Sequence, residues 1–147
     1  MTEAGVLYLD SSALVKLYVD ETGSKDVRRW VAHAPVATTS RVAHVEVAAA
    51  VARRVREQLM AENAANALRA VWERDMERRL AVIDLSATIA AHAALLTEDY
   101  PLRGMDAIHL ASALWIKGSI GSPVTFAVWD VRLGEAARHA GLDVWGV

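Results

Sequence analysis

The chain has 147 residues, a formal net charge of −2 and no cysteine. This length argues for one domain that folds without disulfides or a structural metal. The lack of cysteine excludes cysteine-ligated zinc, iron–sulfur clusters and thiol nucleophiles, and the charge lacks the positive excess usual for nucleic-acid-binding proteins.

Short apolar runs alternate with amphipathic segments along the whole chain. Strands are predicted at Val6–Leu9, Val36–Thr39, Leu80–Leu85, Pro123–Trp129 and Leu142–Trp145. Helices are predicted at Ser11–Tyr18, at Gly23–His33 with Ser24 as N-cap, from the cap Ser40 to about Gln58, at Ala61–Arg79, from the cap Ser86 to about Thr97, at Met105–Lys117, and at Val131–His139, which Gly141 ends. The strand runs are continuously apolar, which is typical of parallel strands covered on both faces. We therefore predict a single α/β domain over residues 1–147, a three-layer α/β/α sandwich with a five-stranded, mainly parallel sheet.

Two features indicate where the protein is found. The first five residues contain no basic side chain and precede only four apolar residues, which is not the pattern of a secretory signal. The longest nearly apolar stretch, Val42–Ala52, contains His44 and Glu46 and is too short and too polar to span a bilayer. We expect a cytoplasmic protein with no membrane partner.

Four acidic residues occupy positions where functional groups gather in such folds. Asp10 directly follows the first predicted strand and Asp130 the fourth. Glu46 lies in the helix after the second strand, and Asp106 lies at the start of the helix Met105–Lys117. Ligands of parallel α/β sheets bind beyond the carboxyl ends of the strands. We therefore expect the four carboxylates to meet within metal-bridging reach at that edge.

Each acid also has a purely structural explanation. Asp10, Asp130 and, less well, Asp106 can cap helix N-termini, which is the commoner role for any one of them taken alone. Glu46 lies beyond the first turn of its helix, so capping does not explain it. Its neighbours are valine and alanine, among which a carboxylate is costly unless a cation or hydrogen bonds compensate. The structural alternative is an exposed Glu46 paired with Arg53.

Four converging carboxylates need a cation to stay ionised together. Oxygen-only donors suit Mg²⁺, and no histidine or cysteine cluster indicates zinc. Apart from these four acids the chain has 16 basic and 14 acidic residues. The remaining surface is therefore slightly basic, which suits a phosphodiester substrate. Arginine supplies 13 of the basic residues, a bias that fits phosphate contacts and is equally what a GC-rich genome produces.

At these residues the sequence resembles the PIN-domain ribonucleases of the VapC toxin type. Val6–Tyr18 resembles the first motif of that family, Glu46 occupies its second acidic position, Leu102–Ala111 resembles its third motif and Phe126–Leu133 its fourth. The match runs in order over nearly the whole chain. The resemblance implies an endoribonuclease that depends on Mg²⁺ or Mn²⁺, forms a homodimer and is inhibited by a VapB-type antitoxin. It also implies that Asp10, Glu46, Asp106 and Asp130 are catalytic and bind the metal.

The fourth motif departs from the family pattern at one position. Many relatives carry a hydroxyl residue two positions before the fourth acid, where this chain has Val128. Asp130 is therefore expected either to bind the metal or to orient a metal-bound water. Ser12 is a supporting candidate, because a hydroxyl at a helix N-terminus can bind a carboxylate or phosphate, or simply cap the helix.

Several residues near the acids are candidates for RNA binding or for positioning. The candidate RNA contacts are Lys16, Arg41, Arg103 and Arg132, and a solvated surface position is the simpler interpretation of each one alone. His109 lies one turn from Asp106, where it can orient a carboxylate or be a hydrogen-bonded core histidine.

The predicted helices around residues 42–52 and 61–79 suggest a surface for the antitoxin. The first is small and apolar, and the second alternates charges with Leu68, Val71 and Trp72 at helical spacing. We expect a helical clip beside the sheet, with Trp30 or Trp72 anchoring an amphipathic partner helix. The alternative is that both tryptophans pack in the core.

Other functions fit the sequence less well. A response-regulator receiver needs an acidic pair after the first strand, and Asp10-Ser11 does not supply it. A dinucleotide-binding domain needs G-x-G-x-x-G, which is absent, and a haloacid-dehalogenase-like phosphatase needs an aspartate where Ser12 stands. The remaining alternative is a non-catalytic PIN-like module that titrates a partner, and the four intact acids argue against it.

Overall fold

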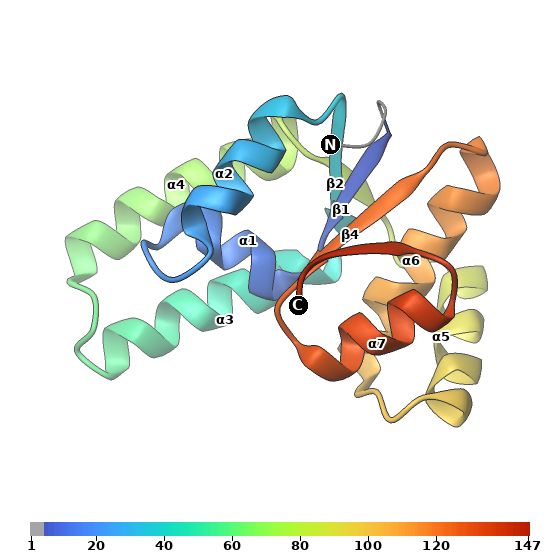
Figure 1. Ribbon diagram of the computed structural model, residues 1–147. Helices are drawn as coiled ribbons and strands as arrows, with labels where there is room; N and C mark the ends of the chain where they lie inside the picture. Colours follow the sequence, from blue (N-terminus) through green and yellow to red (C-terminus); the bar gives the residue numbers. More distant parts are fainter. Residues whose placement is uncertain (1–4) are drawn as a thin grey trace.

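A computed structural model describes residues 5–147. Its five strands form one sheet in the order β3-β2-β1-β4-β5, and every neighbouring pair is parallel (Figure 1). The strands are β1 (Val6–Leu9), β2 (Val36–Ser40), β3 (Ala81–Ile83), β4 (Val124–Val128) and β5 (Asp143–Gly146). The predicted α/β class is confirmed, and the sheet is parallel throughout.

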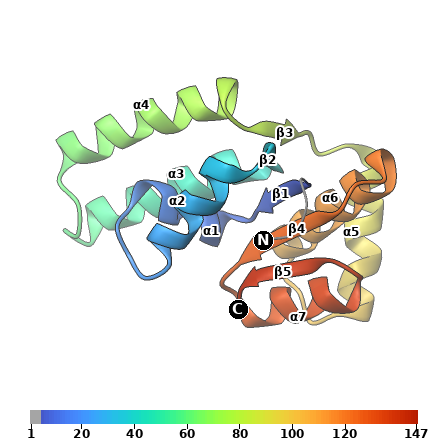
Figure 2. The same cartoon turned by 45° about the horizontal axis from the view of Figure 1, so that its top comes forward.

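Helices cover both faces of this sheet. They are α1 (Ser11–Tyr18), α2 (Ser24–His33), α3 (Val42–Arg56), α4 (Glu62–Arg78), α5 (Ala87–Asp99), α6 (Gly104–Ile120) and α7 (Val131–His139). The first four lie on one face and the last three on the other (Figures 1 and 2). No helix in residues 5–147 is long and apolar enough to cross a membrane.

The central strand β1 divides the apolar core into two parts. Side chains alternate along a strand, so Val6 and Tyr8 pack with α5 and α6, whereas Leu7 and Leu9 pack with α1 to α4. All four are buried. Asp10, the next residue, has the same parity as Tyr8, and this directs it toward the α6 side of the sheet edge.

Helices α3 and α4 form an antiparallel pair that extends beyond the sheet (Figure 1). The predicted helical pair is present, but Trp72 is not a surface anchor. It is 1% exposed and packs edge-on against Tyr18. Trp30 is half-buried and stacks on Trp129, with 5.6 Å between ring centroids. Trp72 therefore belongs to the core, where a large aromatic ring buries the most apolar area.

Three local predictions need correction. Ser40 is the last residue of β2 and not the N-cap of α3, because Arg41 precedes that helix. Ser24 is the first helical residue of α2, not its N-cap, because its hydroxyl donates to the carbonyl of Val19 and accepts from the amide of Glu21. Gly23, with φ +93°, precedes the helix instead. Strand β3 covers only Ala81–Ile83 of the predicted Leu80–Leu85, since it lies at the sheet edge and has one paired neighbour.

We expect Gly146→Ala to destabilise the protein by about 1–3 kcal/mol. Gly146 has φ +112°, and a Cβ there would overlap the carbonyl oxygen of Val128 in the neighbouring strand. Thermal unfolding followed by circular dichroism measures the effect. Gly118→Ala in α6 is the matched control, because a Cβ there meets nothing within 4 Å and alanine favours the helix. Equal melting temperatures for the two variants would contradict the expectation.

Candidate active site

Asp10 is both a helix cap and a buried acid. Its carboxylate accepts hydrogen bonds from the Ala13 amide at 3.0 Å and from the Ser12 hydroxyl at 2.6 Å. The Asp10 residue is only 3% exposed. The capping explanation is thus correct, and it does not exclude a functional role, because one carboxylate has lone pairs for more than these two donors.

Ser12 connects the ends of two neighbouring strands. Its hydroxyl donates to Asp10 at the end of β1 and accepts from the amide of Trp129 just after β4, at 3.1 Å. Val128 is buried and offers no hydroxyl. Ser12 therefore holds the Asp10 carboxylate against the turn that leads to Asp130.

Glu46 faces the interior of this edge and not Arg53. Its Oε1 lies 2.6 Å from Nε2 of His109, and the other ring nitrogen of His109 lies 2.8 Å from the Tyr8 hydroxyl. His109 is 1% exposed. The hydrogen bond compensates for placing a carboxylate beside an apolar helix. His109 is therefore both a hydrogen-bonded core histidine and a residue that orients a carboxylate, the two roles that the sequence suggested.

Asp106 and Asp130 complete the group. Asp106 is half-buried in the first turn of α6, and Asp130 is exposed and caps α7 through a 2.9 Å hydrogen bond from the Leu133 amide. Burial raises the pKa of Asp106, and the charges of Asp130 and Glu46 raise it further. His109 and Arg103 partly offset this rise in the pKa. The four acids thus lie near enough for their charges to interact.

Asp10 is the most perturbed carboxylate at this edge. Burial raises its pKa to about 6, and Glu46 adds to the rise. His109, Ser12 and the Ala13 amide lower the pKa without cancelling the effect of burial. A carboxylate whose ionised form is destabilised in this way favours a cationic ligand.

The four carboxylates do not converge as a ready-made metal cage. Within residues 5–147, no three Asp, Glu or His side chains are close enough together to hold a metal ion. The prediction of metal-bridging reach is therefore wrong for this arrangement of side chains. Like charges repel, and Asp10, Glu46 and Asp130 each turn toward a hydrogen-bond donor of the protein. The chemistry of the donor set still fits Mg²⁺, since it consists of carboxylate oxygens that disfavour each other's charge.

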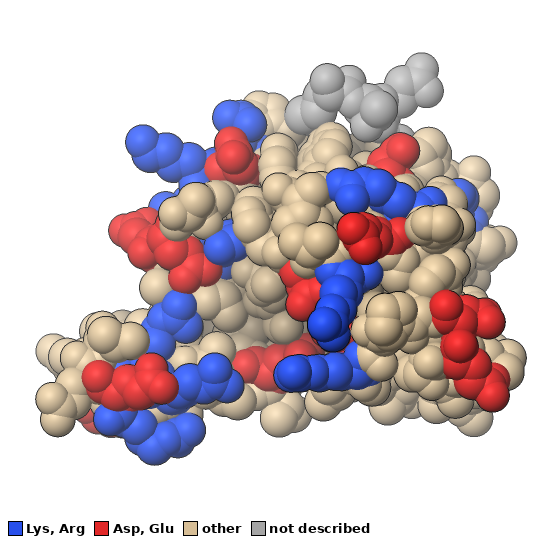
Figure 3. All heavy atoms as spheres, turned by 60° about the horizontal axis from the view of Figure 1, so that its bottom comes forward, with Lys and Arg blue, Asp and Glu red and all other residues tan. Residues whose placement is uncertain are grey.

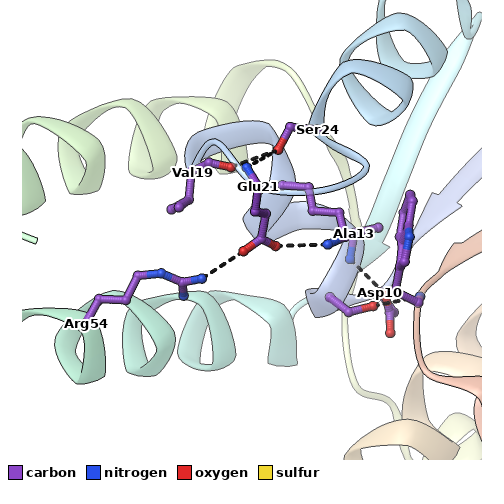
Figure 4. Close-up of polar contacts among 9 residues, drawn as sticks. Asp10, Ala13, Val19, Glu21, Ser24 and Arg54 are labelled. Atoms are coloured by element: carbon purple, nitrogen blue, oxygen red, sulfur yellow. Dashed lines mark hydrogen bonds and ion pairs between the residues drawn. The ribbon is translucent and has the colours of Figure 1, made fainter. Parts of the chain in front are cut away.

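Lys16 is not a free cation. It is buried, its ammonium lies 3.0 Å from Glu21, and it sits over the ring of Trp129 at 4.9 Å. Glu21 is also paired with Arg54 of α3 at 2.9 Å. Figure 4 shows Glu21 between Arg54 and the Asp10 end of α1. This placement disfavours the prediction that Lys16 contacts RNA, because its charge already stabilises the packing of α1 against α3.

The other three basic candidates are exposed around the acids. Arg41 begins α3 and pairs with Asp84 at 2.8 Å, Arg103 is the N-cap of α6, and Arg132 lies in the first turn of α7. Figure 3 views the molecule from the side toward which the strands run and shows acidic and basic side chains interleaved there. These arginines are therefore accessible, but they do not form a continuous basic patch.

One participant was absent from the candidates derived from the sequence. Tyr8 is fully buried and forms the inner end of the hydrogen-bonded series that reaches Glu46 through His109. The sequence spacing of Tyr8 and His109 from the acids could have identified them. Tyr8 precedes Asp10 by two residues on a strand, and His109 follows Asp106 by three on a helix, so each shares a face with an acid.

A family model described as PIN domain matches residues 7–120. The chain belongs to the PIN-domain family. Asp10, Glu46 and Asp106 lie inside the matched range, and Asp130 lies after it. Among curated proteins, the chain is 39% identical over 140 residues to Ribonuclease VapC45 of Mycobacterium tuberculosis strain CDC 1551 / Oshkosh, covering 95% of this chain and 94% of that protein. The same figures hold for Ribonuclease VapC49 of strain ATCC 25618 / H37Rv.

Solved structures share the PIN-like fold of this chain. The M. tuberculosis toxin VapC20 aligns with a TM-score of 0.67 at 18% identity, over 96% of this chain and 98% of that one. FitAcB of Neisseria gonorrhoeae aligns with a TM-score of 0.64 at 16% identity, over 95% and 96%. VapBC2 of Rickettsia felis, bound to a DNA fragment from its promoter, aligns with a TM-score of 0.64 at 12% identity, over 95% and 97%.

The raised pKa of Asp10 predicts how the stability of the metal-free protein depends on pH. A folded pKa of about 6, above the ordinary 3.8, means that the native state binds the proton more tightly than the unfolded state. The contribution of Asp10 to the free energy of unfolding is therefore full below pH 4 and is lost as pH rises through 6. The loss amounts to about 3 kcal/mol.

Asp10→Asn should remove this dependence of the free energy of unfolding on pH. The variant should be more stable than wild type at pH 7. An asparagine oxygen can still accept from Ala13 and Ser12, so the cap survives. Urea unfolding in a chelator at pH 4.5, 6 and 7.5 measures the difference between the two proteins. A difference that does not change with pH would show that Asp10 has an ordinary pKa.

Proposed function

We propose that this PIN-domain protein is a metal-dependent endoribonuclease toxin that is neutralised by a VapB-type antitoxin. The observation that carries the proposal is the set of four carboxylates, which come from the ends of β1 and β4 and from α3 and α6. Glu46 raises the pKa of Asp10, and Asp130 and Glu46 raise the pKa of Asp106. They occur in a chain that resembles proteins named Ribonuclease VapC over 95% of its length. The proposed site of action is the cytoplasm, where RNA is the substrate.

The proposed metal is Mg²⁺, with Mn²⁺ as the alternative. A divalent ion bound here would lower the pKa of a coordinated water and offset charge on the scissile phosphate. Asp10 and Asp106 would hold it with Glu46, whose second carboxylate oxygen is not used by His109. Ser12 keeps Asp10 oriented. Asp130, which is exposed and fixed at the start of α7, either binds the ion or orients a water.

We propose that the exposed arginines guide the RNA to the acids. Arg103 lies beside Asp106 at the start of α6, and Arg132 lies two residues after Asp130. Arg132 also lines a cavity of about 640 Å³ together with Tyr100 and His139. Guanidinium groups bind phosphate by paired hydrogen bonds, and an aromatic ring can stack on a base. Arg41 flanks the same edge from the start of α3.

Exposed apolar side chains next to the acids support the antitoxin proposal. Val45 precedes Glu46 and is 66% exposed, Val131 follows Asp130 and is 58% exposed, and Met105 precedes Asp106 and is also exposed. An apolar rim around an acidic site fits an amphipathic segment that brings a cation to the carboxylates. This rim takes the place of the anchor expected at Trp72. The protein is also proposed to be a homodimer, as the family resemblance implies.

We expect Asp106→Asn to abolish RNA cleavage while leaving the fold intact. Removing one charge from the acidic group relieves repulsion, so the melting temperature in chelator should hold or rise. Cleavage of a mixed-sequence RNA with and without Mg²⁺ should fall by at least about a thousandfold. Asp26→Asn, an exposed aspartate in α2 that pairs with Arg29, is the matched control.

If wild type and Asp106→Asn cleave RNA equally, or neither does so with Mg²⁺ or Mn²⁺, the alternative of a non-catalytic binding module is preferred. Sequencing the 5′ ends of cellular RNA after brief induction would identify the substrate.

The antitoxin proposal predicts that the double variant Val45→Ser/Val131→Ser binds a co-expressed VapB-type antitoxin at least about tenfold more weakly than wild type, since two exposed apolar contacts are lost. Leu59→Ser is the matched control, because Leu59 is 73% exposed beyond the end of α3. Titration calorimetry measures the affinity. The purified wild-type complex should cleave poorly, and excess Mg²⁺ should restore activity only in part. Unchanged affinity in the double variant would exclude this rim as the docking surface.

A further inference from the structure

Two buried polar side chains, Tyr8 and His109, lie directly beneath the carboxylates and have no role in the proposed chemistry. With Glu46 they form a hydrogen-bonded series. The Tyr8 hydroxyl is 2.8 Å from Nδ1 of His109, and Nε2 of His109 is 2.6 Å from Oε1 of Glu46. Tyr8 and His109 are almost fully buried. The series therefore joins the central strand β1, the helix α6 and the helix α3 through two hydrogen bonds inside the core.

The carboxylate of Glu46 determines the directions of these two hydrogen bonds. An ionised Glu46 can only accept, so Nε2 of His109 donates to it. In a neutral imidazole the other nitrogen is then an acceptor, and the Tyr8 hydroxyl donates to that nitrogen. Each buried polar atom of the series has its partner, and one tautomer of His109 satisfies the whole arrangement. Glu46 thus determines the tautomer, and Tyr8, whose hydroxyl can donate or accept, completes the arrangement.

The series is also in register with the other acids. Tyr8 and Asp10 are two residues apart on one face of β1, and His109 and Asp106 are three residues apart in α6. The same backbone segments that place Asp10 and Asp106 therefore place the groups that hold Glu46. Glu46 comes from α3, on the opposite face of the sheet from α6, and residues 5–147 provide its side chain with no ion pair other than that with His109. Without His109, the Glu46 carboxylate would keep its helix but lose its direction.

We propose that His109, buried and hydrogen-bonded to Tyr8, is the positioning residue that directs Glu46 into the carboxylate site. One oxygen of Glu46 stays on His109, and the other is presented to the metal. The inference rests on the proposed function, because it concerns Glu46 as a metal-binding residue. Hydrogen-bond partners of this kind, which touch a metal-binding side chain and not the metal, commonly change metal affinity by about 10- to 100-fold.

The test compares Mn²⁺ affinity, measured by titration calorimetry, in wild type, His109→Gln and His109→Asn. The amide nitrogen of glutamine can reach the place of Nε2 and donate to Glu46, whereas that of asparagine corresponds to Nδ1 and cannot reach it. We expect His109→Asn to weaken Mn²⁺ binding by at least about tenfold. His109→Gln should restore most of the affinity. RNA cleavage should follow the same order.

Two further variants separate positioning from general stability. Leu110→Ala removes a fully buried side chain of the same helix without touching Glu46, so it should lower the melting temperature and leave Mn²⁺ affinity within about twofold. Tyr8→Phe removes only the hydroxyl and should weaken Mn²⁺ binding less than His109→Asn does. Nitrogen NMR of the imidazole should show a proton on Nε2 in wild type, and a change in the Nδ1 shift in Tyr8→Phe as the hydrogen bond to Tyr8 is lost.

The outcomes distinguish the inference from the function on which it rests. If wild type binds neither Mn²⁺ nor Mg²⁺, the proposed function fails and this inference fails with it. If wild type binds Mn²⁺ and His109→Asn binds it equally well, only the inference is overturned. The same holds if Leu110→Ala loses as much affinity as His109→Asn, since the effect is then one of stability. Should His109→Asn not fold, His109→Gln and the NMR signature decide, and an Nε2 that carries no proton in wild type overturns the inference.

Discussion

The burial of one carboxylate at the end of the central strand constrains the rest of the site. Asp10 follows β1, which has strands on both sides, so the chain can leave the sheet there only by turning directly into α1. The turn buries the carboxylate, and burial raises its pKa to about 6. Ser12 and the Ala13 amide compensate in part. His109 also lowers the pKa of Asp10, and Glu46 raises it further.

The parallel sheet explains why the other acids lie near Asp10. In a parallel sheet all strands end at the same edge, so residues that follow β1 and β4 become neighbours although they are far apart in sequence. Burial raises the pKa of Asp106, and the charges of Asp130 and of Glu46, which comes from α3, raise it further. Asp10, Glu46 and Asp130 each accept a hydrogen bond from a different part of the protein.

Two clusters of side chains hold the helices around the site in place. Lys16 pairs with Glu21 and lies over Trp129, and Glu21 reaches Arg54 on α3. This cluster ties α1 and the segment after it to the last turn of α3. On the other face of the sheet, His109 and Tyr8 do the equivalent for Glu46. The two clusters therefore hold α3 near both ends, through Glu46 in its second turn and through Arg54 in its last turn.

The sequence by itself determined the fold class and placed the four acids at one edge of the sheet. Alternating apolar runs and amphipathic segments are local signals, and acids that follow parallel strands share an edge whatever the strand order is. The tertiary structure alone decided the strand order, the burial of Trp72, the pairing of Lys16 with Glu21 and the direction of Glu46. The Glu46–His109 bond joins residues 63 positions apart, and the Tyr8–His109 bond joins residues 101 positions apart. Such contacts depend on how helices pack across a sheet, and no local periodicity encodes that packing, because the same amphipathic pattern allows several neighbours.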